Sequence, residues 1–212
     1  MLELYHAPGS CALASLVCLY ETGAPFTARR LALGEGEQRS EWYRAMAPHG
    51  RVPLLVVDGT PVSETIAILS YIAERFPEVQ LLSSDPLAKA RAYEFMSWIA
   101  SSVHATIGQL WRSERFVDDE AGAASLKAGA PARLDAAFVE INGRIAGPWA
   151  MPEGYSAVDP YLGVVYRWAV RLGTDMNRFP RWQAHNARLL ERPAVQQALA
   201  AEKAEEKEVI NA

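Results

Sequence analysis

The chain has 212 residues, half of them hydrophobic, and a formal net charge of −4. Charges of both signs are mixed along it, so no basic surface for nucleic acid or for an anionic membrane is indicated. The length is enough for one large domain or two small ones with buried cores. This composition favours a small-molecule partner.

No apolar run approaches the roughly 20 residues that a membrane span requires, and the N-terminus lacks the pattern of a secretory signal. Cys11 and Cys18 lie in one predicted helix, where a rise of about 1.5 Å per residue separates their Cα atoms by about 10 Å. That distance excludes a disulfide, and free thiols are typical of a reducing compartment. We therefore expect a cytoplasmic protein.

Hydrophobic spacing and turn residues define the first elements in chain order. They are a strand over residues 1–5, a helix ending at Gly23, a strand over 26–33, a short helix over 38–46, a hairpin of strands 54–57 and 61–63 around Asp58-Gly59, and a helix that stops before Pro77. The order βαβαββα predicts a small mixed sheet with helices on its faces.

After Pro77 every segment is helical in pattern. The predicted helices run from about Pro86 to Glu114, from about Pro131 to Ala146, from Ser156, over Trp182–Leu190, and from Pro193 into a charged tail, EKAEEKE, expected to be solvated. We expect a first domain over residues 1–78, a linker over 79–85 and an all-helical domain over 86–212.

The stretch HAPGSCALAS turns at Pro8-Gly9 and places Ser10 and Cys11 at the first turn of a helix. Unpaired N–H groups and the positive dipole end favour an anion there, which predicts a lowered pKa for a cysteine thiol. A plain helix cap at Ser10 with Cys11 as a small apolar filler explains the stretch equally well. Cys18, in the middle of the helix, is expected in the core.

Two further stretches carry polar or unusual residues at element junctions. Pro53 begins a strand without an N–H to donate, which a cis Val52–Pro53 bond would explain. At the next strand-to-helix junction, free N–H groups and the Thr65 hydroxyl would bind a carboxylate, and Glu64 an ammonium, as an amino-acid-like ligand requires. Alternatively, Ser63 caps the helix and Glu64 complements its dipole.

Four stretches, LYHAPGSCALA, HGRVPLLVVDG, SETIAILSYIAERFP and YSAVDPYLG, together and in this order resemble the cytosolic glutathione S-transferases, most closely the bacterial beta class. The resemblance covers essentially the whole chain. It implies a thioredoxin-like N-terminal domain, an all-helical C-terminal domain, glutathione as co-substrate, no metal and a homodimer. It also implies that the glutathione thiol is activated for conjugation to a small apolar electrophile.

Residue roles follow from the same resemblance. Cys11 would lie beside the glutathione sulfur, with Ser10 as the competing hydroxyl. The residues expected to bind glutathione are Val52 and Pro53 for its cysteinyl part, Glu64 and Thr65 for its γ-glutamyl end, and His104 near the substrate cleft. An apolar pocket for the electrophile is expected from Trp111, Tyr166 and Trp168, each of which could equally belong to the core. A lysine of the beta class that reaches the glycine end is missing, and His49 or Arg51 would replace it.

Ser156 and Asp159 have the spacing of a capping box, serine at the N-cap and an acidic side chain three residues later. We expect them to stabilise the fold by about 0.5–2 kcal/mol rather than to take part in chemistry.

Two alternative functions stay open. With Cys11 as the nucleophile, the chain would catalyse glutathione-dependent thiol–disulfide exchange or reduction. A non-catalytic protein of the same fold would only bind ligands or a partner.

Overall fold

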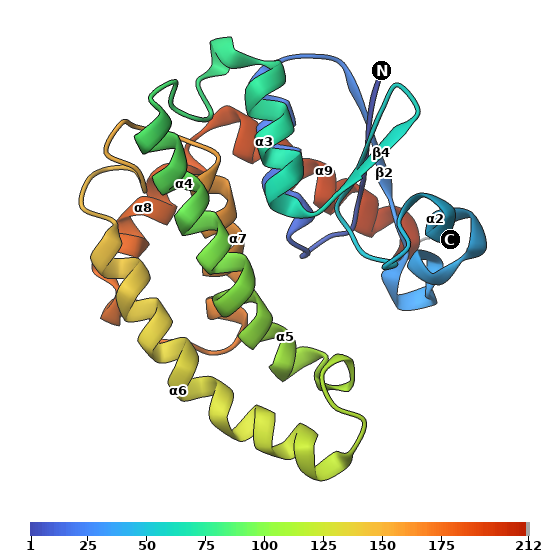
Figure 1. Cartoon of the computed structure of the whole chain (residues 1–212), viewed down its shortest axis with the longest axis vertical. Helices are drawn as coiled ribbons and strands as arrows, with labels where there is room; N and C mark the ends of the chain where they lie inside the picture. The colour runs from blue at the N-terminus through green and yellow to red at the C-terminus, as the bar shows by residue number, and fades with distance from the viewer. Residues whose placement is uncertain (211–212) are drawn as a thin grey trace.

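The computed structural model describes the backbone of residues 1–210 and the side chains of residues 1–203. Its N-terminal part is a four-stranded mixed sheet with helices on both faces, and the remainder is helical (Figure 1). The first part contains β1 (Leu2–His6), α1 (Ala12–Thr22), β2 (Phe26–Arg30), the 3₁₀ turns η1 (Leu33–Glu35) and η2 (Glu37–Arg39), α2 (Glu41–Met46), β3 (Leu54–Val57), β4 (Thr60–Ser63) and α3 (Thr65–Arg75). The predicted order βαβαββα is confirmed.

The sheet has the strand order β2-β1-β3-β4. β1 is parallel to β2, with Leu4 opposite Ala28, and antiparallel to β3, with Leu4 opposite Leu55. The β3–β4 hairpin turns at Asp58 and Gly59, whose φ angles are 48° and 86°. Positive φ at both positions is what a two-residue type I′ turn requires, and an Asp-Gly pair supplies it.

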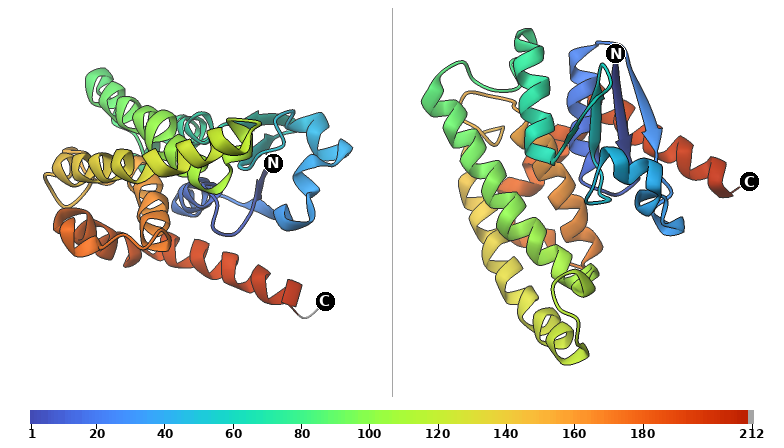
Figure 2. Two further views of the ribbon diagram at one scale, coloured as in Figure 1. Left: turned by 90° about the horizontal axis from the view of Figure 1, so that it is seen from below. Right: turned by 45° about the vertical axis from the view of Figure 1, so that its right-hand side comes forward.

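The helical part begins after η3 (Pro77–Val79). It contains α4 (Pro86–Trp98), the π-helical stretch η4 (Ile99–His104), α5 (Ala105–Trp111), the 3₁₀ turn η5 (Ser113–Arg115), α6 (Glu120–Arg144), α7 (Val158–Arg171), the 3₁₀ turn η6 (Met176–Arg178), α8 (Pro180–Leu190) and α9 (Pro193–Ile210). Residues 211–212 of the predicted helical domain lie outside the described residues. Helix α9, red in Figure 2, runs back beside the N-terminal part and packs against α1.

Two predicted helix boundaries are wrong. The helix expected to end at Glu114 stops at Trp111, because Arg112 leaves the helical region with φ −144° and ψ 46°. The helix expected to begin at Pro131 begins at Glu120, with the carboxylate of Asp119 accepting from the Gly122 N–H at 2.7 Å. Its first turns are rich in alanine and glycine, so they lack the apolar spacing on which the prediction depended.

The sheet separates two clusters of buried side chains. Because side chains alternate across a strand, Leu4 and Leu55 face one cluster, while Tyr5 and Leu54 face another that α2 covers. The first cluster continues through α1 into the helical part, since α1 packs against α3, α7 and α9. The start of α1 is therefore held by both parts of the molecule.

Candidate active site

Cys11 lies at the N-cap of α1, and its side chain meets residues from two other segments. The thiol donates to the backbone oxygen of Val52 at 3.6 Å, just before β3, and the side chain of Thr65, at the start of α3, lies near enough to stabilise its thiolate form. The Val52–Pro53 bond is cis, as expected. The three stretches that the sequence marked therefore meet around one sulfur atom.

The Cys11 thiol is not acidified in this environment. Burial raises its pKa and outweighs the opposing effects of the Thr65 hydrogen bond, the Cys11 backbone N–H and the positive charge of Arg51. The expectation that the start of a helix would lower this pKa is therefore wrong. Desolvation destabilises the thiolate here by more than the hydrogen bonds and the charge of Arg51 stabilise it. At neutral pH, Cys11 is a protonated hydrogen-bond donor.

Ser10 uses its hydroxyl to shape the turn before α1. The hydroxyl donates to the backbone oxygen of Ala7 at 2.6 Å and accepts from the Ala12 N–H at 3.3 Å. Its one hydrogen is thus already committed within the turn. Gly9 has φ +73°, a left-handed conformation that glycine adopts without steric cost.

The helical part holds both backbone groups of Gly9. The Gly9 N–H donates to the carboxylate of Glu202 on α9 at 3.2 Å, and the Gly9 oxygen accepts from the indole of Trp168 on α7 at 2.9 Å. The other Glu202 oxygen accepts from Arg167 at 2.9 Å. Two helices far along the chain therefore fix the turn that precedes Cys11.

The expectation that the charged tail is solvated is wrong for Glu202. Its side chain is buried, and it lies on the same face of α9 as Val195 and Ala198. Spacings of three and seven residues from Val195 are the signal that would have predicted its burial. The tail residues after Lys203 have no described side chains.

Glu64 and Thr65 form the junction between β4 and α3. Glu64 is an exposed residue with φ 73° and ψ 124°, a sparsely populated conformation for a residue other than glycine. Such conformations cost about 1–3 kcal/mol and are concentrated at functional sites. Ser63 makes no side-chain cap to α3, so the purely structural interpretation of this junction is wrong for Ser63.

His104 ends the π-helical stretch and faces the same region. Its Nδ1 lies 3.3 Å from the Tyr161 hydroxyl, and its ring lies 4.6 Å from that of Trp168. Burial, followed by the charges of Arg51 and Arg115, lowers the pKa of His104 to about 4. The imidazole is therefore neutral at pH 7.

Two of the three aromatic residues predicted for the electrophile pocket lie together. The rings of Trp111 and Trp168 are 5.9 Å apart and nearly perpendicular. Tyr166 instead packs edge-on against Trp182 at 5.4 Å, on another side of α7. Side chains two residues apart on a helix do not face the same way, so Tyr166 is removed from the predicted pocket.

Arg51 is the better placed of the two candidates for the missing loop lysine. Both Arg51 and His49 are exposed, but only Arg51 is close enough to act electrostatically on Cys11, His104 and Arg115. Arg115 was not among the predicted site residues, and its pKa is lowered by burial and by neighbouring arginines. An isolated arginine in a polar loop gives no sequence signal for such a role.

The described residues give no sign of a metal site or a membrane span. Among the side chains of residues 1–203, no group of three or more His, Cys, Asp or Glu could hold a metal ion. Within the described part of the chain, every helix is too short or too polar to cross a membrane.

Comparisons with known proteins agree with this geometry. Residues 1–74 match the family model described as "Glutathione S-transferase, N-terminal domain". Glutathione S-transferase GstA of Escherichia coli O157:H7 is 31% identical over 205 residues, which cover 95% of this chain and 98% of the relative. Glutathione S-transferase GST-4.5 of Xanthomonas campestris has the same identity and coverage.

Solved structures give the same result. A glutathione transferase homolog from Sulfitobacter with bound glutathione matches with a TM-score of 0.89 and 29% identity, covering 97% of this chain and 98% of that one. A sphingomonad glutathione S-transferase complexed with glutathione matches with a TM-score of 0.83 and 31% identity, covering 95% and 98%. With relatives this similar over nearly its full length, the chain belongs to the glutathione S-transferase family.

Proposed function

We propose that this protein binds glutathione at the junction of α1, β3 and α3 and adds the glutathione thiolate to an electrophile with an apolar body. The observation that carries the proposal is the meeting of Cys11, Val52 and Thr65 around one buried sulfur, next to the strained Glu64. The glutathione held by the two structural neighbours described above supports the choice of co-substrate.

The glutathione thiolate would accept a hydrogen bond from the Cys11 thiol. That thiol now donates to the Val52 oxygen at 3.6 Å, a long contact that a bound thiolate can replace. A hydrogen bond to an ionised acceptor is stronger than one to a neutral acceptor, so it stabilises the thiolate and lowers the pKa of the glutathione thiol. Ser10 is less suited because its hydrogen is committed to the Ala7 oxygen.

The two ends of glutathione need different binding groups. The γ-glutamyl end has an ammonium and a carboxylate, which suit the Glu64 carboxylate and the Thr65 hydroxyl with the first N–H groups of α3. The glycine end has a carboxylate, for which Arg51 supplies a cation. Val52 and Pro53 lie between these groups and would contact the cysteinyl part, with His104 on the opposite side of the cleft.

Thiol exchange with Cys11 as the nucleophile is disfavoured. The thiolate is the attacking form, and burial raises the pKa of Cys11 rather than lowering it.

The test is turnover of 1-chloro-2,4-dinitrobenzene with glutathione, together with the thiolate absorbance of bound glutathione as a function of pH. We expect turnover and a bound thiol that ionises at lower pH than in buffer. Cys11→Ala should retain conjugation at a rate about ten- to 150-fold lower, because a hydrogen bond to a charged acceptor contributes about 1.5–3 kcal/mol. Complete loss of conjugation, or ionisation of bound glutathione as in buffer, would contradict the proposal.

Binding is tested at the α3 junction by a neighbouring pair of variants. Thr65→Ala should raise the Kd for glutathione, whereas Ser63→Ala, an exposed neighbour without a capping bond, should leave it unchanged.

The assembly and location of the enzyme are part of the same proposal. We propose a homodimer, on the resemblance to the family, and a cytoplasmic location, which the two free cysteines support. We also place the domain boundary at residues 79–85. Light scattering of the purified chain tests the dimer, and limited proteolysis tests the linker.

A further inference from the structure

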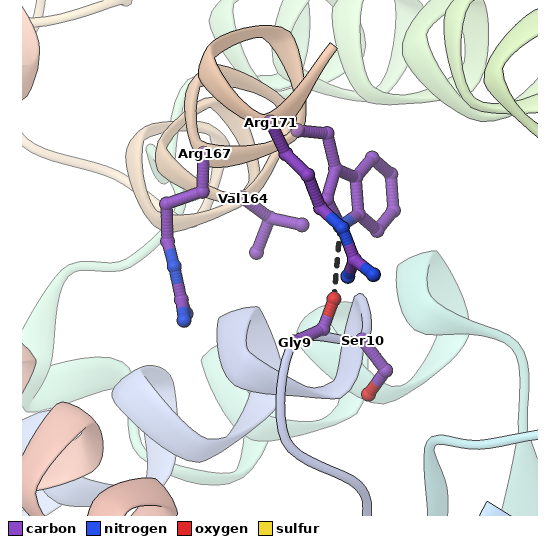
Figure 3. Close-up of a pocket in the computed structure, with 6 residues that line it drawn as sticks. Gly9, Ser10, Val164, Arg167 and Arg171 are labelled. Carbon is purple, nitrogen blue, oxygen red and sulfur yellow. Dashed lines mark hydrogen bonds between the residues drawn. The ribbon is translucent and has the colours of Figure 1, made fainter. Parts of the chain in front are cut away.

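A cavity of about 180 Å³ lies between the turn before α1 and helix α7. Its lining residues come from both parts of the molecule: Gly9, Ser10, Val164, Arg167, Trp168 and Arg171. Figure 3 shows Arg167 and Arg171 extending from α7 toward the Gly9–Ser10 turn. A cavity of about 150 Å³ can hold a benzene ring, so this one has room for a single substituted ring.

The two arginines of the cavity differ in their partners. Arg167 is neutralised by Glu202 at 2.9 Å. Arg171 makes no ion pair with any side chain that the structure describes, and its guanidinium lies over the ring of Trp111 at 5.3 Å. Among the described side chains, the cavity therefore presents one cation without an ion-pair partner beside the ring of Trp168, which in turn packs against Trp111.

Further arginines gather in the segment that follows Trp111 and in loops near it. Arg112 directly follows Trp111, and it lies close enough to Arg115 to act on it electrostatically, as do Arg39 and Arg51. The chain as a whole has a net charge of −4, so this concentration of arginines is local. A local excess of positive charge raises the local concentration of anionic ligands.

We propose that this cavity binds an acidic group on the electrophile, so that the enzyme prefers aromatic electrophiles bearing a carboxylate. The ring would pack against Trp168, and the carboxylate would accept hydrogen bonds from Arg171. Ser10, the neighbour of Cys11, lines the cavity. A ring held there would therefore lie next to the proposed position of the glutathione sulfur. This inference rests on the proposed function for its identification of the ligand as a substrate.

Binding is measured first, because it does not depend on turnover. The full chain with glutathione is titrated with 4-nitrobenzoate and, in parallel, with nitrobenzene, and quenching of tryptophan fluorescence is followed. We expect 4-nitrobenzoate to bind about tenfold more tightly, as one charge-assisted hydrogen bond allows. Arg171→Gln should remove this preference.

Two further variants sharpen the result. Glu202→Gln removes the negative charge that neutralises Arg167 and keeps an amide oxygen for Gly9, so it should tighten 4-nitrobenzoate binding. Arg181→Gln removes an arginine that lines a separate cavity beside α8 and should change nothing. Opposite effects at Arg171 and Glu202 are not expected from a general loss of folding.

Turnover then separates this inference from the proposed function. The matched electrophiles are 4-chloro-3,5-dinitrobenzoate and 1-chloro-2,6-dinitrobenzene, which differ only in the carboxylate. A kcat/KM ratio that favours the carboxylate in the native protein and disappears in Arg171→Gln supports the inference. If neither is turned over while 4-nitrobenzoate binding still requires Arg171, the proposed function fails and the anion site remains. If Arg171→Gln changes neither binding nor the ratio, the inference is overturned.

Discussion

The indole nitrogen of Trp168 donates a hydrogen bond to the backbone oxygen of Gly9 at 2.9 Å, across 159 residues of sequence. This bond links α7 to the turn that sets the position of Cys11, while the same ring packs against His104. The turn before α1 therefore depends on the helical part of the molecule for its conformation, and the two parts of the chain form one site.

Trp168→Phe keeps an aromatic ring but removes this hydrogen bond. We expect the free energy of unfolding to fall by about 0.5–1.5 kcal/mol, the usual net value of one bond. Urea denaturation measures it. Trp98→Phe is the control, because that indole makes no hydrogen bond to a described residue, and a loss as large in the control would refute the assignment.

Glu202→Ala should destabilise the protein more strongly. It leaves the Gly9 N–H and the Arg167 guanidinium without their acceptor, and bonds that involve a charged group contribute about 1.5–3 kcal/mol. Because Arg167 is partly exposed and can be hydrated, we expect a loss near the lower end. The exposed Glu94→Ala on α4 is the control for thermal unfolding, and equal melting temperatures would show that the contact is unimportant.

Cys11 should react slowly with iodoacetamide at pH 7.5. Burial raises its pKa, so its thiolate fraction is below that of a free cysteine, whose pKa is about 8.5. The alkylation rate of a Cys18→Ala variant, in which Cys11 is the sole cysteine, should still be rising above pH 9. A plateau reached below pH 8 would instead support the alternative in which Cys11 is the nucleophile.

Much of the fold could be predicted because, within short stretches of the chain, the hydrophobic spacing and the turn residues indicate the same elements. The Asp58-Gly59 turn and the junction at Thr65 are encoded within a few residues. The start of α6 was missed because its first turns bury few side chains, and its cap, Asp119, precedes no apolar repeat. Local signals define elements well only where the element has a buried face.

The site was predicted less completely, for a different physical reason. The motifs placed Cys11 at the first turn of a helix. The sign of its pKa shift, however, depends on how many atoms from distant segments exclude water from the sulfur. Glu202 and Arg171 act through partners on other helices, and sequence spacing carries no information about those partners. What the local pattern supplies is the position of a side chain, not its solvation.

His104 should make the stability of the fold depend on pH in a defined window. Its pKa is about 4 in the folded chain and about 6.5 when unfolded, so between these values the unfolded state binds more protons. Its contribution to stability is therefore present above pH 6.5 and is lost as the pH falls toward 4, by roughly 2–3 kcal/mol.

Urea denaturation of the native protein and of His104→Gln, between pH 4 and 7, measures this effect. The variant should show a flatter dependence, because glutamine does not titrate. His49→Gln, which changes an exposed histidine on the loop before β3, should retain the slope of the native protein. Parallel slopes in all three proteins would contradict the low pKa of His104.

Asp159 does more than the capping role expected from its spacing. Its carboxylate accepts from the Ser156 N–H at 2.7 Å, which is one half of a capping box, and from the Ser156 hydroxyl at 3.1 Å, whereas the Ser156 oxygen accepts from the Val158 N–H at 3.3 Å. The carboxylate also accepts from the Ala150 N–H at 2.8 Å and from Nε2 of His185 at 2.7 Å. Both Asp159 and His185 are almost completely buried. The residue therefore joins the start of α7 to the preceding loop and to α8.

Asp159→Ala should consequently cost more than a lost cap. Three buried residues lose their acceptor, so we expect a decrease of about 3–5 kcal/mol in the free energy of unfolding, compared with about 0.5–2 kcal/mol for Ser156→Ala. Chemical denaturation of both variants compares the two losses. Equal losses would mean that Asp159 acts only through the cap, and that its contacts with Ala150 and His185 add little, because those groups find water or another acceptor when the carboxylate is removed.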